Sequence, residues 1–484
     1  MLARALRANF NKIIAVEKVA ETPSGAIFST FREALHGSHG DFTEGPIGRA
    51  VILLAVPMVL EMALESVFAV VDVFWVSRLG AASIAAVGLT ESILALIYAL
   101  AIGLAMAATA MVARRIGERD RERAACTAVQ AIALGLFVAL PLGALGAFLA
   151  PRLLALMGAT PDVLRVGSRF TAVMLGGNVV IVLLFLINAI FRGAGDAAVA
   201  MRVLWIANAI NLVLDPCLIF GWGPFPALGV TGAAVATTTG RGIAVVLQLV
   251  TLARGTGRLA VRREHLRLDP KTMVSLLRLS GSAIVQSLVG TASWIGLVRI
   301  LASFGSAALA GYTIAIRIVI FALLPSWGMS NAAATLVGQN LGAKKPDRAA
   351  RSVFLAGLYN MAFLGVVGIV FVAVPGALVG LFTQDPAIRP IATQGLRIIA
   401  AGFLFYAWGM VLVQAFNGAG DTWTPTVINL FVFWLWEIPL AYLLAVRAGF
   451  GPRGVFLAIA IAFSTLAVAG GVLFRRGKWK EKKV

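Results

Sequence analysis

Three acidic residues, Glu61, Glu65 and Asp72, lie within a single apolar stretch of the chain. At 100° per residue in a helix they fall at about 0°, 40° and 20°, which makes one stripe about 16 Å long. Carboxylates within an apolar helix are costly unless they face water, protein or a cation. The stripe predicts a path for a cation or a positively charged substrate at Glu61 and Glu65. Pairing of the acids with arginines is the alternative.

Pro57 lies beside this stripe, one turn before Glu61. A proline within a helix removes one backbone hydrogen bond and permits a bend. A bend at this point would change the solvation of the carboxylates, and therefore their affinity for protons. Pro57 thus predicts a link between cation uptake and the shape of the helix, with a static kink as the alternative.

A second polar group lies further along the chain. Asn211 and Asp215 are four residues apart, so a helix places them on one face. Asn188, in the preceding apolar stretch, is expected to reach them across a helix–helix gap, together with Asp72. Such oxygen ligands suit Na⁺, and paired carboxylates suit a shared proton. The four residues predict a cation-coupling site, with plain interhelical hydrogen bonds as the alternative for either asparagine.

The elements that must position these residues follow from composition. Hydrophobic residues make up 60% of the 484 residues and charged residues only 13%, which is too apolar for soluble domains. We expect an all-α polytopic membrane protein in which twelve apolar runs cross the bilayer as helices. The runs cover residues 49–77, 86–111, 125–150, 170–191, 198–220, 229–253, 280–303, 309–336, 353–375, 395–416, 425–447 and 453–474.

The net charge of +19 would suggest nucleic acid in a soluble protein. Across twelve spans, however, 30 Lys and Arg residues fall on the side of the two termini, eight on the other side and three within spans. By the positive-inside rule this asymmetry predicts cytoplasmic termini in a cell membrane, and it excludes a nucleic-acid partner. The N-terminal tail holds no run long enough for a signal peptide.

The second half of the chain repeats the first at an offset of 225 residues, so that Phe191–Asp196 returns as Phe416–Asp421 and Pro161 as Pro386. Six spans in each repeat predict two six-helix lobes related by a pseudo-two-fold axis along the membrane normal, an arrangement typical of alternating access. The predicted parts are a cytoplasmic tail (1–46), an N-lobe (47–253), a cytoplasmic linker (254–279), a C-lobe (280–474) and a basic cytoplasmic tail (475–484).

Within the first tail, Leu2, Leu6, Phe10, Ile13 and Ile14 recur near helical spacing among basic residues. They predict a helix that lies on an anionic leaflet. A loose tail is the alternative.

The C-lobe differs from the N-lobe in its acids, because Glu437 is the only acid clearly inside a C-lobe span. The coupling chemistry is therefore expected in the N-lobe. Arg299 and Arg317 need partners, for which Glu91 and Glu437 are candidates. The repeat partners of Glu61, Glu65, Asp72 and Asp215 are Gln286, Gly290, Leu297 and Leu440.

A resemblance to a known family rests on Pro57 and on the segments Val71–Gly80, Phe191–Asp196, Asn211–Pro216, Gly229–Thr237 and Val337–Gly342. With these segments, the sequence resembles the multidrug and toxic compound extrusion (MATE) family over about residues 45–470. In its lack of C-lobe acids it resembles the DinF-like branch more than the NorM-like branch, which places cation-binding carboxylates in that lobe.

The resemblance implies twelve helices in two lobes that export organic, often cationic and amphipathic compounds, driven by inward movement of H⁺ or Na⁺. It implicates Asp72 and Asp215 with Asn188 and Asn211 as neighbours, and Pro57 in bending of the first helix. Glu61 and Glu65 match no signature of the family.

A lipid-linked precursor flippase of the same superfamily is the alternative, which twelve spans and an acidic N-lobe disfavour. The sequence holds no phosphate loop, metal-ligand cluster or nucleophilic triad, so we expect no enzyme, and no cofactor beyond the coupling ion. The expected partners are small organic substrates and the bilayer, and the expected oligomeric state is a monomer.

Overall fold

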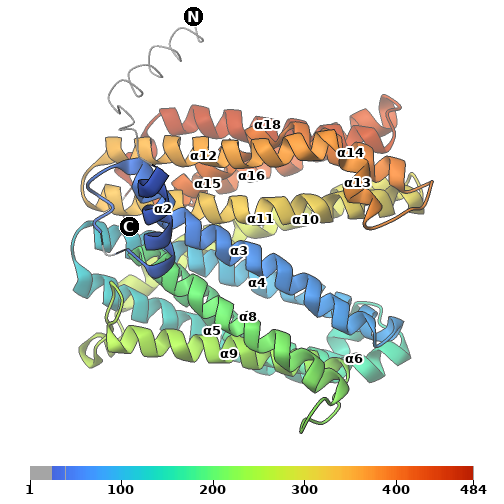
Figure 1. Cartoon of the computed structure of the whole chain (residues 1–484), viewed down its shortest axis with the longest axis horizontal. Helices are drawn as coiled ribbons and strands as arrows, with labels where there is room; N and C mark the ends of the chain where they lie inside the picture. Colours follow the sequence, from blue (N-terminus) through green and yellow to red (C-terminus); the bar gives the residue numbers. More distant parts are fainter. Residues whose placement is uncertain (1–23, 39, 483) are drawn as a thin grey trace, which may run out of the picture.

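The protein is a bundle of long helices (Figure 1). The computed structural model describes residues 24–38, 40–482 and 484, and these residues contain helices and no strand. Eleven helices are long and apolar enough to cross a membrane, and a pair bent by 58°, Arg389–Ala401 with Phe403–Gly418, supplies a twelfth. The predicted all-α fold with twelve spans is therefore confirmed.

The N-lobe consists of six spans separated by short turns. Gly80 and Gly195 have φ angles of 91° and 90° and start or end helices, a backbone conformation that glycine adopts without strain. The fourth span is broken at Gly177 into α6 and α7. The helices are α3 (Ile47–Ser77), α4 (Ala81–Gly117), α5 (Arg121–Leu156), α6 (Pro161–Gly176), α7 (Asn178–Ala194), α8 (Ala197–Phe220) and α9 (Val230–Arg254).

The C-lobe repeats this order, with π-helical turns in its fifth span. Its helices are α10 (Pro270–Ala302), α11 (Ser306–Gly342), α12 (Pro346–Ala373), α13 (Pro375–Gly380), α14 (Arg389–Ala401), α15 (Phe403–Gly418), α16 (Trp423–Asn429), the π-helical η2 (Leu430–Glu437), α17 (Ile438–Tyr442), the π-helical η3 (Leu443–Arg447) and α18 (Pro452–Arg475).

The linker between the lobes contains the short helix η1 (Arg263–Leu266) and is shorter than the predicted 254–279. Asp269 accepts a hydrogen bond from the Lys271 backbone N–H at 3.0 Å, and Pro270 begins α10. Asp followed by proline is a strong helix start. The first turns of α10 are polar, so the apolar run in the sequence begins later than the helix, at residue 280.

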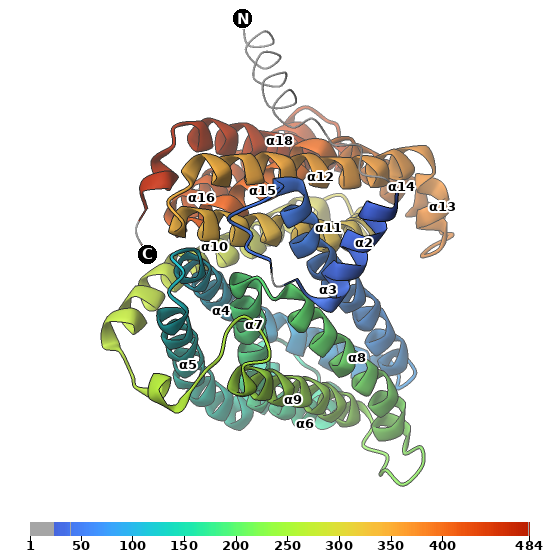
Figure 2. The ribbon, with the colours of Figure 1, turned by 60° about the vertical axis from the view of Figure 1, so that its left-hand side comes forward.

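The two lobes meet most closely at the end of the bundle where α2 (Ser24–His36) and the C-terminus lie (Figures 1 and 2). A Cβ atom at Gly117 would overlap the carbonyl oxygen of Gln339, and one at Gly342 would overlap that of Arg114. These two contacts are related by the offset of 225 residues. The lobes are thus arranged about a pseudo-two-fold axis that passes between α4 and α11, as the repeat predicts.

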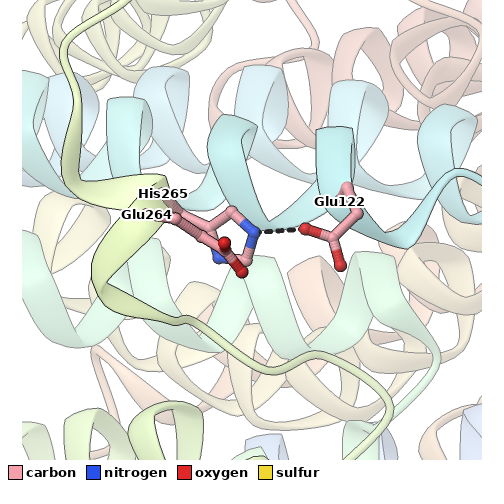
Figure 3. A group of neighbouring side chains, drawn as sticks. All are labelled: Glu122, Glu264 and His265. Carbon is pink, nitrogen blue, oxygen red and sulfur yellow. Dashed lines mark hydrogen bonds and ion pairs between the residues drawn. The ribbon is translucent and has the colours of Figure 1, made fainter.

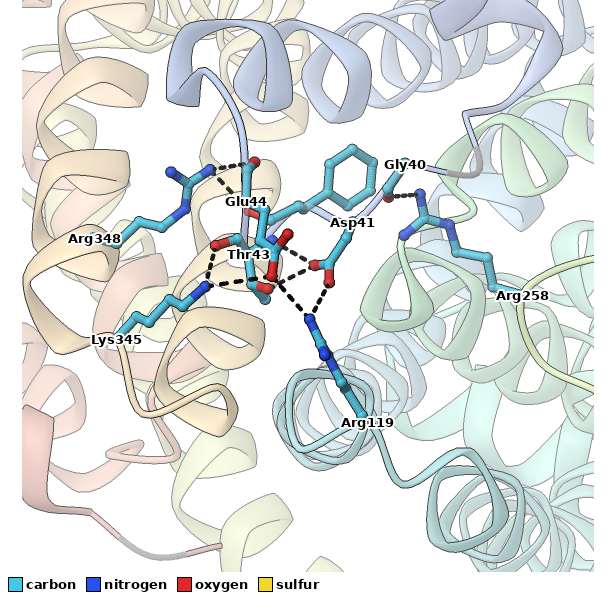
Figure 4. Close-up of polar contacts among 9 residues, drawn as sticks. Gly40, Asp41, Thr43, Glu44, Arg119, Arg258, Lys345 and Arg348 are labelled. Carbon is cyan, nitrogen blue, oxygen red and sulfur yellow. Dashed lines mark hydrogen bonds and ion pairs between the residues drawn. The ribbon is translucent and has the colours of Figure 1, made fainter.

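A segment of the N-terminal tail, residues 40–46, bridges the two lobes at this end; we call it the strap (Figure 4). Arg119 of the N-lobe donates to Asp41 and Glu44 at 3.3 and 2.9 Å. Arg348 of the C-lobe donates to the backbone carbonyl of Glu44 at 2.7 Å. The linker joins as well, because Arg258 donates to the Gly40 carbonyl at 2.5 Å. The strap therefore ties three parts of the chain together.

The chain's last residues also lie across this end. Trp479, in the short helix η4 (Lys478–Glu481), is buried and stacks on Phe474. Arg114 donates to the Lys482 carbonyl at 2.6 Å, and the Lys482 ammonium lies 3.2 Å from Asp421. The basic tail is thus packed against both lobes. The leaflet-bound helix predicted around Leu2–Ile14 falls outside the described residues.

Candidate functional site

The acidic stripe of α3 faces protein, as its spacing predicts. Glu61 is buried, and Glu65 and Asp72 are half-buried. Glu61 Oε1 lies 3.5 Å from Arg192 Nη1, and Glu65 Oε1 lies 3.2 Å from Arg241 Nη2. Glu61 and Glu65 are therefore each paired with an arginine, which is the arrangement that the sequence offered as the alternative to a cation or substrate path.

A cavity of about 220 Å³ lies over these ion pairs, where the N-lobe faces the C-lobe. We call it the N-lobe cavity. Because each of its two acids has an arginine partner, the cavity carries no net formal charge. Its charged and amide side chains come from Glu61, Glu65, Asn188, Arg192 and Arg241 of the N-lobe and from Asn331, Gln414 and Asn417 of the C-lobe.

Asn188 belongs to this cavity and not to the group around Asp215. Its Nδ2 donates to Glu61 Oε1 at 3.2 Å, and its Oδ1 accepts from Gln248 Nε2 at 2.5 Å. Asn188 lies six residues before the end of α7 at the strap end of the bundle, whereas Asp215 lies near the opposite end of α8. Because α7 and α8 run in opposite directions, the predicted contact between these residues does not form.

Asp72 and Asp215 form a second polar group, further from the strap. Asp215 is fully buried and lies close enough to Asp72 for the two carboxylates to interact electrostatically. With its amide nitrogen turned toward Asp215, Asn211 donates to Asp215 Oδ2 at 2.7 Å and accepts from the Thr237 backbone N–H at 3.0 Å. Three of the four predicted coupling residues are therefore neighbours.

These two aspartates each keep one unsatisfied oxygen. The Oδ1 atoms of Asp72 and Asp215 are buried and accept no hydrogen bond from any residue that the structure describes. A buried anionic oxygen without a donor is costly, and a proton or a bound cation removes that cost. The pair therefore has the chemistry of a site for H⁺ or Na⁺.

Three residues of α9 were missed by sequence reasoning, although their spacing carried a signal. Thr237, Arg241 and Gln248 are separated by four and seven residues, the same intervals that separate Glu61, Glu65 and Asp72. They too lie on one helix face, and each contacts the predicted group: Thr237 through Asn211, Arg241 through Glu65 and Gln248 through Asn188. Two matching polar stripes on antiparallel helices thus line the N-lobe.

Of the intramembrane arginines, Arg317 has Glu91 within electrostatic range. This is one of the two counter-ions expected for it. Arg299 is exposed on the surface of α10.

The linker holds a third polar cluster, formed by Glu122, Glu264 and His265 (Figure 3). The Arg262 backbone N–H donates to His265 Nδ1 at 2.9 Å, so the ring proton is on Nε2, which lies 2.5 Å from Glu122 Oε2. Both ring nitrogens are engaged, and no lone pair is free for a metal. The cluster therefore fastens the linker to α5.

Two six-span lobes with a polar cavity between them are the arrangement of a membrane transporter. The chain belongs to the MatE family, which matches residues 57–217 and 282–443. The two matched segments begin 225 residues apart, which confirms the internal repeat found in the sequence.

The chain is similar to the probable multidrug resistance protein NorM of Thermotoga maritima, with 26% identity over 441 residues, covering 90% of this chain and 94% of that protein. It is 27% identical to the FAD transporter of Shewanella oneidensis over 443 residues, or 90% and 96% of the two chains. A solved structure of a MATE in the straight conformation superposes with a TM-score of 0.86 at 25% identity, covering 92% of this chain and all of that one (100%).

Proposed function

We propose that the protein is a secondary active exporter of organic, amphipathic and mainly cationic compounds, of the DinF-like branch, driven by inward movement of H⁺ or Na⁺. The observation that carries this proposal is the Asp72–Asp215 pair with its two unsatisfied buried oxygens. The similarity to a multidrug resistance protein supports the substrate class.

Coupling rests on the electrostatics of this pair. Two ionised carboxylates in a low-dielectric site repel each other, and one bound proton or Na⁺ removes both the repulsion and part of the desolvation cost. Asn211 holds Asp215 in place through one oxygen and leaves the other free for the cation. Cation binding thus changes which arrangement of α3 against α8 is the most stable.

The bend in the first helix converts this change into movement. Pro57 lies inside α3, and Glu61, Glu65 and Asp72 all follow it along the helix. A bend at Pro57 therefore displaces the whole acidic stripe relative to α9 and reshapes the cavity over Glu61. In this way the loaded state of the aspartates determines the shape of the substrate path.

The orientation follows from the charges. Thirty of the 41 Lys and Arg residues lie in segments on the strap side, among them those that hold the strap and the C-terminal tail. We therefore place the strap end, with both termini, at the cytoplasmic face of the plasma membrane. Contact of the lobes at the strap end then corresponds to a state that is closed toward the cytoplasm.

Replacement of Asp72 tests the proposal in cells. Asp72→Asn removes the charge and keeps the shape, so the variant should reach the membrane at the normal level and confer no drug resistance in an efflux-deficient host. Asp162→Asn is the matched control and should retain resistance. Asp162 is exposed, lies in the first turn of α6 at the end of the bundle opposite the strap, and pairs with Arg165. Full resistance from Asp72→Asn would rule out its role in coupling.

A further inference from the structure

A second, larger cavity of about 530 Å³ lies in the C-lobe. Its volume is within the range of sites that bind drug-sized molecules. Among the described residues that line it, Glu437 is the single charged side chain. Ile102, Met106 and Trp327 line both cavities, so the two adjoin at the lobe interface.

The two cavities occupy equivalent places in the repeat. At the offset of 225 residues, eight residues of the N-lobe cavity correspond to eight residues of the C-lobe cavity, and the charged side chains are lost among them. The pairs are Glu61 and Gln286, Met62 and Ser287, Glu65 and Gly290, Ile102 and Trp327, Phe185 and Met410, Asn188 and Val413, Leu204 and Asn429, and Arg241 and Leu466.

The two cavities therefore differ in net formal charge. In the N-lobe cavity both acids are compensated, by Arg192 and Arg241. In the C-lobe cavity the equivalents of these arginines are Asn417, which lies outside the described lining, and Leu466, so Glu437 has no cationic neighbour there. A positively charged ligand would therefore be stabilised in the C-lobe cavity and would gain little in the N-lobe cavity.

Glu437 is buried, with 3% of its surface exposed, and the lining of the cavity also contains neutral acceptors. The amide oxygens of Gln286 and Asn429 line the same cavity, are buried, and have no hydrogen-bond donor within the described part of the chain. Glu437 is thus the one formal charge in a described lining whose other polar groups are neutral. An ammonium compensates such a charge and donates its N–H bonds to the carboxylate.

The rest of the lining suits an aromatic body. Tyr312 and Tyr406 lie within electrostatic range of Glu437, and Trp294, Trp327 and Phe433 also line the cavity. Aromatic faces attract organic cations and pack against flat rings. Glu437 itself is the last residue of the π-helical η2, and π-helical turns are frequent at functional sites.

We propose that the C-lobe cavity is the binding site for an aromatic ammonium cation, with Glu437 as the counter-charge. The inference rests on the proposed export function, for which it names the substrate site. It gives the two lobes different roles, since the N-lobe aspartates bind the coupling cation and the C-lobe glutamate binds the substrate.

Equilibrium binding to the purified full-length protein tests this inference independently of transport. Propranolol, a naphthyl ammonium, is compared with naproxen, a naphthyl carboxylate, by isothermal titration. Propranolol should bind, and Glu437→Gln should raise its Kd about tenfold or more, because a hydrogen-bonded charge is lost. Glu264→Gln, an exposed acid of the linker, should leave the Kd unchanged. An unchanged Kd in Glu437→Gln, or equal binding of naproxen, would overturn the proposal.

A measurement on the unmodified protein covers the case in which Glu437→Gln fails to fold. Dicyclohexylcarbodiimide labels carboxyl groups in apolar surroundings, and peptide mass spectrometry locates the label. Propranolol should protect Glu437 from labelling and naproxen should not; labelling of Glu437 that propranolol leaves unaffected would contradict the site. Absence of cation-driven transport by the unmodified protein would refute the proposed function while leaving this binding result intact, so the two failures are distinguishable.

Discussion

Glu61 Oε1 and Arg192 Nη1 lie 3.5 Å apart, and this ion pair joins α3 to α7 beneath the N-lobe cavity. Glu61 also accepts a hydrogen bond from Asn188 at 3.2 Å. The first acid of the α3 stripe is thus held in place by two side chains of one neighbouring helix. Its role is to anchor α3 on the strap side of the coupling aspartates.

Breaking this pair should destabilise the protein. Glu61→Gln leaves Arg192 buried without its partner, at a cost of about 3 kcal/mol. Arg192→Gln should cost a similar amount, and the double variant should recover most of the loss, because no uncompensated charge then remains. Unfolding of the purified protein in detergent measures the coupling. Additive effects of the two substitutions would show that the pair contributes nothing.

Most of the fold could be predicted because apolar run length determines which segments cross a bilayer, and the offset of 225 residues determines how the halves correspond. The shared face of Glu61, Glu65 and Asp72 followed from helical period alone. Helix ends were predicted less well, since the polar first turns of α10 and the last turns of α4 extend beyond the apolar window.

The contacts of the site required the structure. The helical period predicts on which face of its helix a residue lies, but not which neighbouring helix that face contacts. The sequence alone therefore could not identify Arg192 and Arg241 as the partners of Glu61 and Glu65. The predicted contact of Asn188 with Asp215 is wrong because the two residues lie at different depths in the antiparallel helices α7 and α8. The three polar residues of α9 could have been found, since their intervals match those of α3.

The two asparagines should therefore differ in function. Asn211→Leu removes the donor to Asp215 and should weaken cation binding about tenfold. Asn188→Leu acts on Glu61 and Gln248 and should leave cation binding unchanged. Binding of ²²Na⁺, and proton release followed with a pH-sensitive dye, measure both variants side by side. Equal effects from the two variants would contradict the separation of the groups.

Pro57→Ala tests the bend in α3. Alanine restores the missing hydrogen bond and favours a straight helix, so thermal stability should rise or stay constant. Transport should fall about tenfold, while cation binding at Asp72 and Asp215 persists. Pro141→Ala, in α5 and outside both cavities, provides a matched proline control. Normal transport by Pro57→Ala would mean that the proline is a static kink.

The strap should respond to acid. Burial opposes ionisation of Asp41, but hydrogen bonds from Thr43 and Arg119 outweigh it and lower the pKa of this carboxyl below its ordinary value of 3.8. A lowered pKa stabilises the folded strap at neutral pH, and this contribution is lost as the pH falls through the lowered value. The protection of the amides of residues 40–46, which is the slowing of their exchange relative to the intrinsic rate at the same pH, should accordingly be high at pH 7 and lower in acid.

Removal of one strap contact should have the same effect without acid. Arg119→Gln loses the bonds to Asp41 and Glu44, so exchange of the strap amides at pH 7 should accelerate. Arg165→Gln, at the opposite end of the bundle, should not change it. Unchanged exchange in Arg119→Gln would show that the backbone contacts to Arg258, Lys345 and Arg348 are sufficient to hold the strap.

Flux in proteoliposomes tests the coupling of export to a cation gradient most directly. Ethidium and berberine, two permanent cations, are followed under an imposed pH gradient and then under an imposed Na⁺ gradient, for the unmodified protein and for Asp72→Asn. One of the two gradients should drive flux in the unmodified protein, and neither should drive it in Asp72→Asn. Flux that ignores both gradients, or that persists in Asp72→Asn, would contradict cation-coupled export through the N-lobe aspartates.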